Sequence, residues 1–475
     1  MRKLRRQISL FDTYQNVVTT MEEDKMKFFR LVDENINWDE LIPDSFWYKF
    51  YQSIGRKRKY PLEGFMKALL IQCVFGYTTD KQLLNTLKYS REMREFCGFT
   101  QVPDADKITR FKQNFCDEHE KLFHILVDKT EDICKELDAE LSDCLIFDST
   151  GIESYVTENN SKFMSGKLKQ AKSIAKSDPN FDPYKGVYSL LPPTSSVNPD
   201  VKQQYINGHF CYAMRTGIVT NGLGIIRHID MLDGDFKSRH PDMPVEKRSD
   251  DPDIDKEIGD STALKPILSD FFELHPKLSY STFLGDSAFD SYDNYSMLMK
   301  DFHFDKAVIP LNLRNSSKVL SSDFDGFGRP RCPIDGTPFI CLGKSGGKNR
   351  SARFKWVCHN SLQVGSKRFC ACDTPCTDSP YGRCVYTYPD ENLRLYPGLP
   401  RESDEWDYLY KKRVAAERSI NYFKNTLILG NRKTFNSQTT KADLLLAGIT
   451  QLLTVLIAHS ISDTKNFRKV RSLIS

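Results

Sequence analysis

The spacing of apolar residues divides the chain into a helical first part and a mixed second part. Residues from about 10 to 140 repeat apolar positions at helical intervals, most clearly from Phe65 to Phe75. The stretch from Thr79 to Tyr89 begins with a threonine that is followed three residues later by Gln82, the pattern of a capping box. We therefore predict a compact helical region over residues 1–140. It is either a helix-turn-helix-like module or a purely structural cap.

The hydrophobic period changes at Cys144. CLIFDSTG is a short apolar run that ends in Asp148 and small turn residues, which predicts a buried strand with a carboxylate at its exit. After a polar insertion (162–198), HFCYAMRTGIVTNGLGIIRHIDML predicts two strands joined at Asn221-Gly222, a strong hairpin signal. A charged loop (236–260) then leads to a helix near 261–274, a strand ending at Asp286, a helix over 292–299 and a strand over 306–310. This order predicts an α/β sheet of the ribonuclease-H type over residues 141–310.

Residues 311–400 break this rhythm and predict an inserted subdomain with little helix. Seven cysteines gather there: Cys332, Cys341, Cys358, Cys370, Cys372, Cys376 and Cys384. From Ser403 the chain returns to helix, which predicts a helical completion of the core over residues 401–475. The most apolar segment, Leu444 to Ile457, is short and contains Thr450, Gln451 and Thr454, so it predicts a buried helix rather than a membrane span.

Composition narrows the class of protein. The chain has 475 residues, 40% hydrophobic and 12% aromatic, which is enough for two to four domains with a substantial core. The net charge of +4 excludes a uniformly basic chain, yet no Asp or Glu lies between Cys341 and Cys372, where seven Lys and Arg occur. Such a run is the footprint expected for nucleic acid, or simply a solvated face. No signal peptide is evident and six cysteines are scattered before residue 212, so we expect a reducing, cytoplasmic location.

Three acidic residues are the candidates for chemistry. Asp148 and Asp286 each end a predicted strand and are each followed by Ser. In YKKRVAAERSINYFK, Tyr410, Arg413, Glu417 and Lys424 fall at roughly 0°, 300°, 340° and 320° on a helical wheel, in one narrow stripe. Such a stripe is either a solvated charge ladder or a carboxylate held among cations that meet phosphates. Likewise, an Asp after a strand either caps a turn or, together with the other two acids, holds two Mg²⁺ ions about 4 Å apart for phosphodiester chemistry.

The spacing of Tyr410, Arg413, Glu417 and Lys424 resembles the Tyr-Arg-Glu-Lys signature of bacterial insertion-sequence transposases with a DDE active site; all four residue types and all three gaps agree. YPLEGFMKALL and GFTQVPDADKITRFKQNF look like the amino-terminal domain of these proteins, and DSTGIES and GDSAFDS resemble their first and second Asp motifs. The resemblance covers most of the chain, with residues 311–400 least secure.

The resemblance implies roles for these residues. Asp148, Asp286 and Glu417 would be catalytic ligands of Mg²⁺ or Mn²⁺, and Tyr410, Arg413 and Lys424 would bind transposon-end DNA. It also implies double-stranded DNA partners (terminal inverted repeats and target DNA), a homodimer in the DNA complex, and a helical N-terminal domain that contacts DNA. A core-filling Tyr410 stays an alternative. So do a nuclease or resolvase of the same chemistry and a domesticated DNA-binding protein without catalysis. No membrane partner is expected.

The cysteine-rich region and two isolated residues leave further alternatives. Dense thiols suggest a structural zinc ion that would let a core-poor segment fold, but no pair has the two-residue gap of a zinc ribbon. Structural zinc and free thiols therefore both stay open, with the ligands unassigned. Trp356 either stacks on a base or fills a core, and His228 is either a structural histidine or a neighbour of the site.

Overall fold

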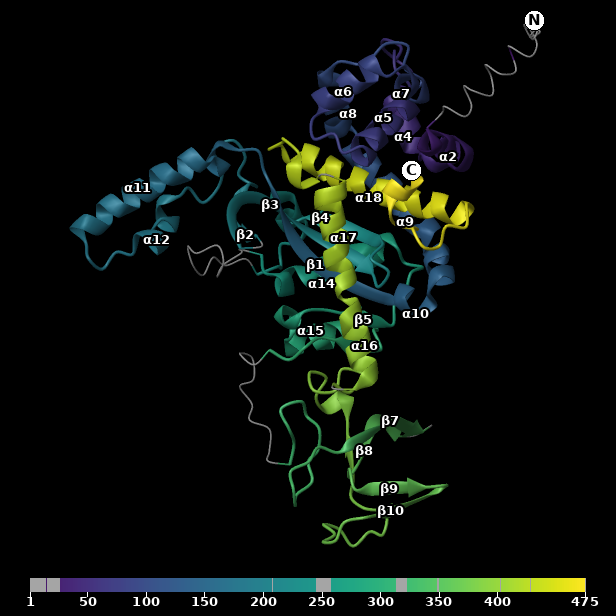
Figure 1. Cartoon of the computed structure of the whole chain (residues 1–475), viewed down its shortest axis with the longest axis vertical. Coiled ribbons are helices and arrows are strands. Elements are labelled where there is room, and N and C mark those ends of the chain that lie inside the picture. The colour runs from purple at the N-terminus through teal and green to yellow at the C-terminus, as the bar shows by residue number, and fades with distance from the viewer. Residues whose placement is uncertain are drawn as a thin grey trace, which may run out of the picture.

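The computed structural model describes Tyr14 and residues 26–206, 208–244, 258–312, 323–347, 350–401, 403–427 and 429–474. Figure 1 shows four parts: a helical head, a central sheet between helices, a small all-β segment at the far end, and an arm that projects sideways from the sheet. The predicted hairpin and most predicted helices are present. The arm coincides with the predicted polar insertion, but its helices were not predicted.

The head is built from short amphipathic helices around the long helix α9. Thr79 caps α6 by accepting from the backbone N–H of Gln82, whose side chain accepts from the Thr79 N–H, so the predicted capping box is confirmed. The helices are α2 (Lys27–Asn35), α3 (Trp38–Leu41), α4 (Asp44–Phe50), α5 (Leu62–Val74), α6 (Asp80–Tyr89), α7 (Arg91–Phe96), α8 (Ala105–Asn114) and α9 (Cys116–Leu137), and the short α10 (Ala139–Ser142) follows beside the sheet (Figure 1).

The C-terminal helix α18 (Ser437–Ser460) joins the head to the sheet. It packs against α9, α8, α5 and the strand β4 (Ile226–Met231), and its apolar residues belong to the same core as those of the head. This helix is long and apolar enough to cross a membrane by length and composition alone, but 89% of its most apolar 18-residue stretch is buried inside the protein. This burial agrees with the predicted buried helix.

The central sheet combines an antiparallel group with a parallel pair. β1 (Cys144–Glu153) pairs antiparallel with β3 (His209–Asn221), which also pairs with β2 (Lys202–Ile206) and β4. On its other side β1 pairs in parallel with β5 (Thr282–Leu284), and β5 with β6 (Lys306–Val308). The predicted turn after Asp148 is wrong: DSTG continues as strand to Glu153, because β3 is long enough to pair with it residue by residue.

Helices cover both faces of this sheet. Leu145 and Phe147 point to a core with α14 (Asp260–Leu274), whereas Cys144 and Ile146 point to a core with α16 (Asp404–Lys412) and α17 (Val414–Asn421). The short helices α13 (Gly234–Arg239) and α15 (Tyr292–Ser296) lie in the connections, α15 with a π-helical turn (Met297–Asp301) after it. The sheet therefore lies between two helical layers.

Two segments stand outside these layers. Residues 162–198, expected to be a polar insertion, form the arm with α11 (Ser161–Ser177) and α12 (Pro183–Gly186). Between β6 and α16 lie a three-stranded sheet of β7 (Ile340–Gly347), β8 (Arg350–Val357) and β11 (Cys384–Thr387), and a hairpin of β9 (Ser361–Val364) and β10 (Lys367–Cys370).

Candidate active site

The register of β1 and β5 brings the two candidate aspartates together. Ile146 pairs with Leu284 in the parallel ladder, and Asp148 and Asp286 each follow two residues later. Alternation along β1 directs the Asp148 side chain to the face of Ile146, which is covered by α16 and α17, and Asp286, the N-cap of the short turn after β5, acts electrostatically on Asp148. Asp148 and Asp286 thus lie side by side beneath the helix that carries Glu417.

The predicted helix from Tyr410 to Lys424 is not continuous. It breaks at Arg413, where bonds from Arg413 N–H to the Tyr410 carbonyl (3.0 Å) and from Ala416 N–H to the Arg413 carbonyl (3.1 Å) span only three residues. After α17 a π-helical turn (Tyr422–Thr426) carries Lys424. The idealised wheel therefore fails, yet the break leaves the polar residues directed at the sheet.

Arg413 links Glu417 to the aspartates. Its Nη2 lies 2.5 Å from Oε1 of Glu417, whose side chain is 44% exposed. The pKa of Arg413 is raised: burial opposes this shift, while Glu417 and, more weakly, Tyr410 and Asp286 produce it. In this arrangement Glu417 is engaged by a cation before any metal binds.

The pKa of the Asp148 carboxyl group is raised. Burial raises its pKa to about 6, the negative charges of Asp260 and Asp286 add to the shift, and the Ser149 backbone N–H and Arg413 oppose it. A raised pKa at a cluster of like charges means that ionising all the carboxylates together is costly. A divalent cation would remove that cost, so these groups are suited to metal binding.

Lys424 lies on the same side of β1. Its Nζ donates to Thr150 Oγ1 at 2.5 Å, and burial lowers its pKa while Cys211 and Asp148 act in the opposite direction. Tyr410 is partly buried against the core of α16 and α17, and its ring centroid lies 5.9 Å from the Arg413 guanidinium. Its aromatic body is therefore packed, as the core alternative requires, next to the charged group.

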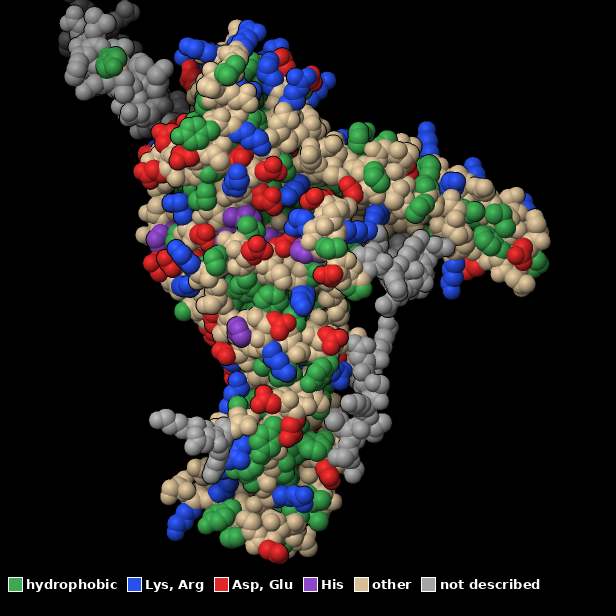
Figure 2. Space-filling model, turned by 180° about the vertical axis from the view of Figure 1, so that it is seen from behind, with side chains coloured by type: hydrophobic (Ala, Val, Ile, Leu, Met, Phe, Trp, Pro, Cys, Tyr) green, Lys and Arg blue, Asp and Glu red, His purple; other side chains and the backbone are tan. Residues whose placement is uncertain are grey.

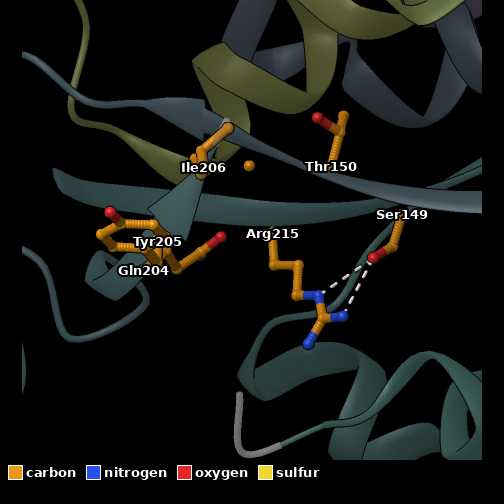
Figure 3. Close-up of a pocket in the computed structure, with 7 residues that line it drawn as sticks. Ser149, Thr150, Gln204, Tyr205, Ile206 and Arg215 are labelled. Carbon is orange, nitrogen blue, oxygen red and sulfur yellow. Dashed lines mark hydrogen bonds between the residues drawn. The ribbon is translucent and has the colours of Figure 1, made fainter. Parts of the chain in front are cut away.

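Sequence reasoning missed a second polar cluster on the opposite face of β1. Arg215 of β3 donates from Nη2 to Asp260 at 2.5 Å and to Ser149 Oγ at 2.9 Å, and Ser149 also bonds to Asp260. Figure 3 shows Arg215 reaching toward Ser149. Two sequence features could have indicated this cluster: Arg215 interrupts an otherwise apolar strand, and Asp260 is an acid at the start of a helix. This cluster anchors α14. It also contains Asp260, the charged residue that contributes most to the raised pKa of Asp148.

A pocket opens beside these residues at the edge of the sheet. It is lined by Ser149, Thr150 and Gly151 of β1, by Gln204, Tyr205 and Ile206 of β2, and by Arg215 (Figure 3). A Cβ added at Gly151 would stand 2.2 Å from Ile206 Cδ1 and 2.5 Å from Gln204 Oε1, so a larger residue there would displace two side chains of β2. The strand that carries Asp148 therefore forms one wall of a polar recess.

Metal-ligand geometry is incomplete at the three acids. Within the described part of the chain, the group whose potential ligand atoms all lie within 4.8 Å of one another is Glu153, His209 and Cys211, farther along β1 and β3. Asp148, Asp286 and Glu417 do not form such a group, and Glu417 is paired with Arg413. Carboxylate oxygens are nevertheless the ligands that Mg²⁺ prefers.

The seven cysteines of the β-segment, which comprises β7 to β11 and their loops, form no disulfide, and four of them lie at a small core. Cys332 and Cys358 are buried with Phe354 and Trp356, and Cys372 packs against them. Burial raises the pKa of Cys358 to about 11, and negative charge on Cys332, Cys372 and Cys376 would raise it further. The loops are tied together by the Ala371 N–H bond to the Asn360 carbonyl (2.9 Å) and by the His359–Asp335 pair (3.2 Å).

The two isolated residues have structural positions. Trp356 is 2% exposed and donates from its indole N–H to Thr387 Oγ1 at 2.8 Å, so it fills a core. His228 is also 2% exposed and its ring lies 5.6 Å from that of His124, on the side of β4 that faces the head. Neither contributes to the site.

Comparison with known proteins identifies one domain. Residues 18–114 match the family model described as "Transposase domain (DUF772)". No curated protein matches the chain. Among solved structures, one similar chain is from "Cryo-EM structure of piggyBac transposase synaptic complex with hairpin DNA (SNHP)", with a TM-score of 0.37 and 11% identity over 94% of this chain and 79% of that chain. The domain match in the helical head supports a DNA transposase in general terms.

Proposed function

We propose that the protein is an insertion-sequence DNA transposase that cleaves strands at terminal inverted repeats and transfers them into target DNA by a metal-dependent DDE mechanism. The main observation behind this proposal is the strand register that sets Asp148 beside Asp286 under the helix of Glu417. The transposase-domain match over residues 18–114 is independent support. A hairpin-joined antiparallel group followed by parallel β5 and β6 supports a ribonuclease-H-like core.

In this proposal Asp148, Asp286 and Glu417 hold Mg²⁺ or Mn²⁺. When bound, two such ions activate the attacking hydroxyl and stabilise the leaving oxygen of the phosphodiester. Asp148 must lose its proton to serve as a ligand. Because its pKa is raised to about 6, we expect metal binding to weaken as the pH falls below about 6. Arg413, released from Glu417, can fork onto a DNA phosphate, whereas Lys424 supplies a point charge beside Thr150.

The same proposal includes the partners. Double-stranded DNA, as terminal repeats and as target, would meet the face that carries Arg413 and Lys424, with Tyr410 beside them. Pairing of two element ends calls for a homodimer in the DNA complex, and a bacterial transposase would act in the cytoplasm. The helical head would contribute further DNA contacts.

We also propose a structural zinc ion in the β-segment, held by Cys332, Cys358, Cys372 and Cys376; their sulfur atoms do not form a group within 4.8 Å of one another, so zinc binding would draw the loops that carry them together. The core around these thiols is small, and zinc supplies folding free energy where apolar burial is limited. Metal analysis of purified protein should give about one zinc per chain, lost with Cys358→Ser and kept with Cys384→Ser, since Cys384 is exposed. Zinc-free native protein would contradict this assignment.

The function is tested by strand joining. A duplex with a free 3′-hydroxyl at the terminal repeat is incubated with target plasmid, Mg²⁺ and either wild-type protein or Asp148→Ala. Joining by the wild type alone, with DNA binding kept in both, supports a transposase. Cleavage without joining points to a nuclease or resolvase, and binding without either reaction points to a non-catalytic DNA-binding protein.

A further inference from the structure

The projecting arm carries an unusual charge pattern. Helix α11 has the sequence SKFMSGKLKQAKSIAKS, with five lysines and no Asp or Glu. It leaves the body of the protein between β1 and β2 (Figure 1). Seen from behind, Figure 2 shows Lys and Arg side chains along the upper edge of the arm.

Four of these lysines share one face. With Lys162 at 0°, about 100° per residue places Lys169, Lys172 and Lys176 at roughly 340°, 280° and 320°, within a stripe about 80° wide. All four are exposed. At about 1.5 Å per residue, the stripe is about 21 Å long, which matches about six base pairs of DNA at 3.4 Å each.

The opposite, apolar face of α11 is already used inside the arm. Ala171 is fully buried, α12 packs against α11, and the Phe181 ring fills the space beside Gly186. Lys172 lies 5.3 Å from the ring centroid of Tyr184, whereas no carboxylate of the described residues forms an ion pair with Lys162, Lys169 or Lys176. The lysine stripe, and not the apolar face, is therefore what the arm presents to a partner.

The arm shares its base with the candidate active site. It begins after β1, which carries Asp148, and returns into β2, whose Gln204, Tyr205 and Ile206 line the recess beside Ser149. DNA that reaches Asp148 from this edge of the sheet would continue past the arm.

We propose that the stripe of Lys162, Lys169, Lys172 and Lys176 binds the sugar-phosphate backbone of duplex DNA that flanks the scissile phosphate. The inference rests on the proposed function and assigns part of its DNA contact to α11. Exposed lysine ammonium groups on one helix face contact phosphates by charge, so we expect the contact to be independent of sequence. An anionic membrane is the less fitting partner, because membrane-surface helices insert an apolar face and part of that face of α11 packs against α12.

The test uses full-length protein with Lys162, Lys169 and Lys176 all changed to Gln; Lys172 is kept because of its contact with Tyr184. The matched control changes Lys129, Lys277 and Lys300 to Gln, which removes the same charge at exposed positions on other elements. Binding to a labelled duplex with the terminal repeat and flanking DNA is measured from 50 to 300 mM salt, with circular dichroism and thermal midpoints to verify folding.

Counterion release makes log K fall with log salt concentration with a slope of about 0.9 per neutralised phosphate. Removing three lysines should therefore reduce the steepness of this slope by about 2.7 in the arm variant, whereas the slope of the control variant should stay close to that of the wild type. Equal slopes in all three proteins would overturn the arm's role while leaving cleavage by the wild type intact. Unchanged DNA slopes with lost binding to phosphatidylserine vesicles would mean that the arm meets a membrane. Wild-type protein that neither binds nor cleaves the repeat would contradict both this inference and the proposed function.

Discussion

Replacing Asp148 by Asn should stabilise the metal-free protein at neutral and alkaline pH. In the folded state the pKa of Asp148 is raised from 3.8 to about 6, mainly by burial and then by Asp260 and Asp286. Between these two values the folded state holds a proton that the unfolded state has released, so wild-type stability falls as pH rises through this window and stays reduced above it. A difference of about 2 pKa units corresponds to about 3 kcal/mol.

The assay is urea unfolding of wild type and Asp148→Asn in EDTA at several values between pH 4 and pH 8. Asn retains an oxygen that can accept the Ser149 backbone N–H, at 2.8 Å from Oδ1 of Asp148, so the local hydrogen bond is kept. We expect near-equal stability at pH 4 and an advantage of up to about 3 kcal/mol for the variant at pH 8. The exposed Asp132→Asn serves as control.

The stability of the same two proteins is also compared with and without Mg²⁺. Because a ligand that binds only the folded state stabilises it, Mg²⁺ should raise the stability of the wild type and have little effect on the variant. A stability difference that does not change with pH, or a variant less stable than wild type at pH 8, would refute the argument that Asp148 is held in a cluster of repelling carboxylates.

Two further predictions concern the join between head, sheet and α18. Lys112 is buried between Asp80 (2.8 Å) and Asp443 (3.0 Å), and of these acids only Asp443 forms a further ion pair within the described part of the chain, with Arg432 at 4.0 Å. Lys112→Met should therefore cost about 3–5 kcal/mol in urea unfolding, and a loss below about 1 kcal/mol would contradict this. Gly448 of α18 lies against Phe123, and an added Cβ would stand 2.7 Å from the Phe123 ring. Gly448→Ala should therefore lower the free energy of unfolding by about 1–3 kcal/mol. An unchanged thermal midpoint would show that the ring can move aside.

Local sequence patterns predicted the elements whose signals are local. The capping box at Thr79, the hairpin near Asn221-Gly222 and the buried character of α18 each depend on neighbouring residues, and each is present. The position of Asp286 just beyond a strand is also present, and it caps a short turn by accepting from the Ala288 N–H at 2.8 Å. At Asp286 the turn-capping alternative therefore coexists with the proposed role in metal binding.

Features set by tertiary pairing could not be predicted in the same way. DSTG has turn-like residues, but the length of β3 draws it into the ladder, so Asp148 lies within a strand and not at its exit. The helix breaks at Arg413, where the hydrogen bonds span three residues, and helical periodicity gives no signal for this break. Partnerships such as Arg215 with Asp260 join residues 45 apart in sequence and leave no periodic signal.

The most direct test of the central claim is Mg²⁺-dependent cleavage of a labelled duplex that carries the element's terminal repeat, with wild type and Glu417→Gln compared at equal DNA occupancy. Gln keeps the size of Glu417 and can still accept from Arg413, but it lacks the charge that a metal ligand needs. We expect cleavage at the repeat boundary by the wild type and none by the variant, with binding retained in both. Equal cleavage by the two proteins would contradict the assignment of Glu417 as a metal ligand and, with it, the proposed DDE site.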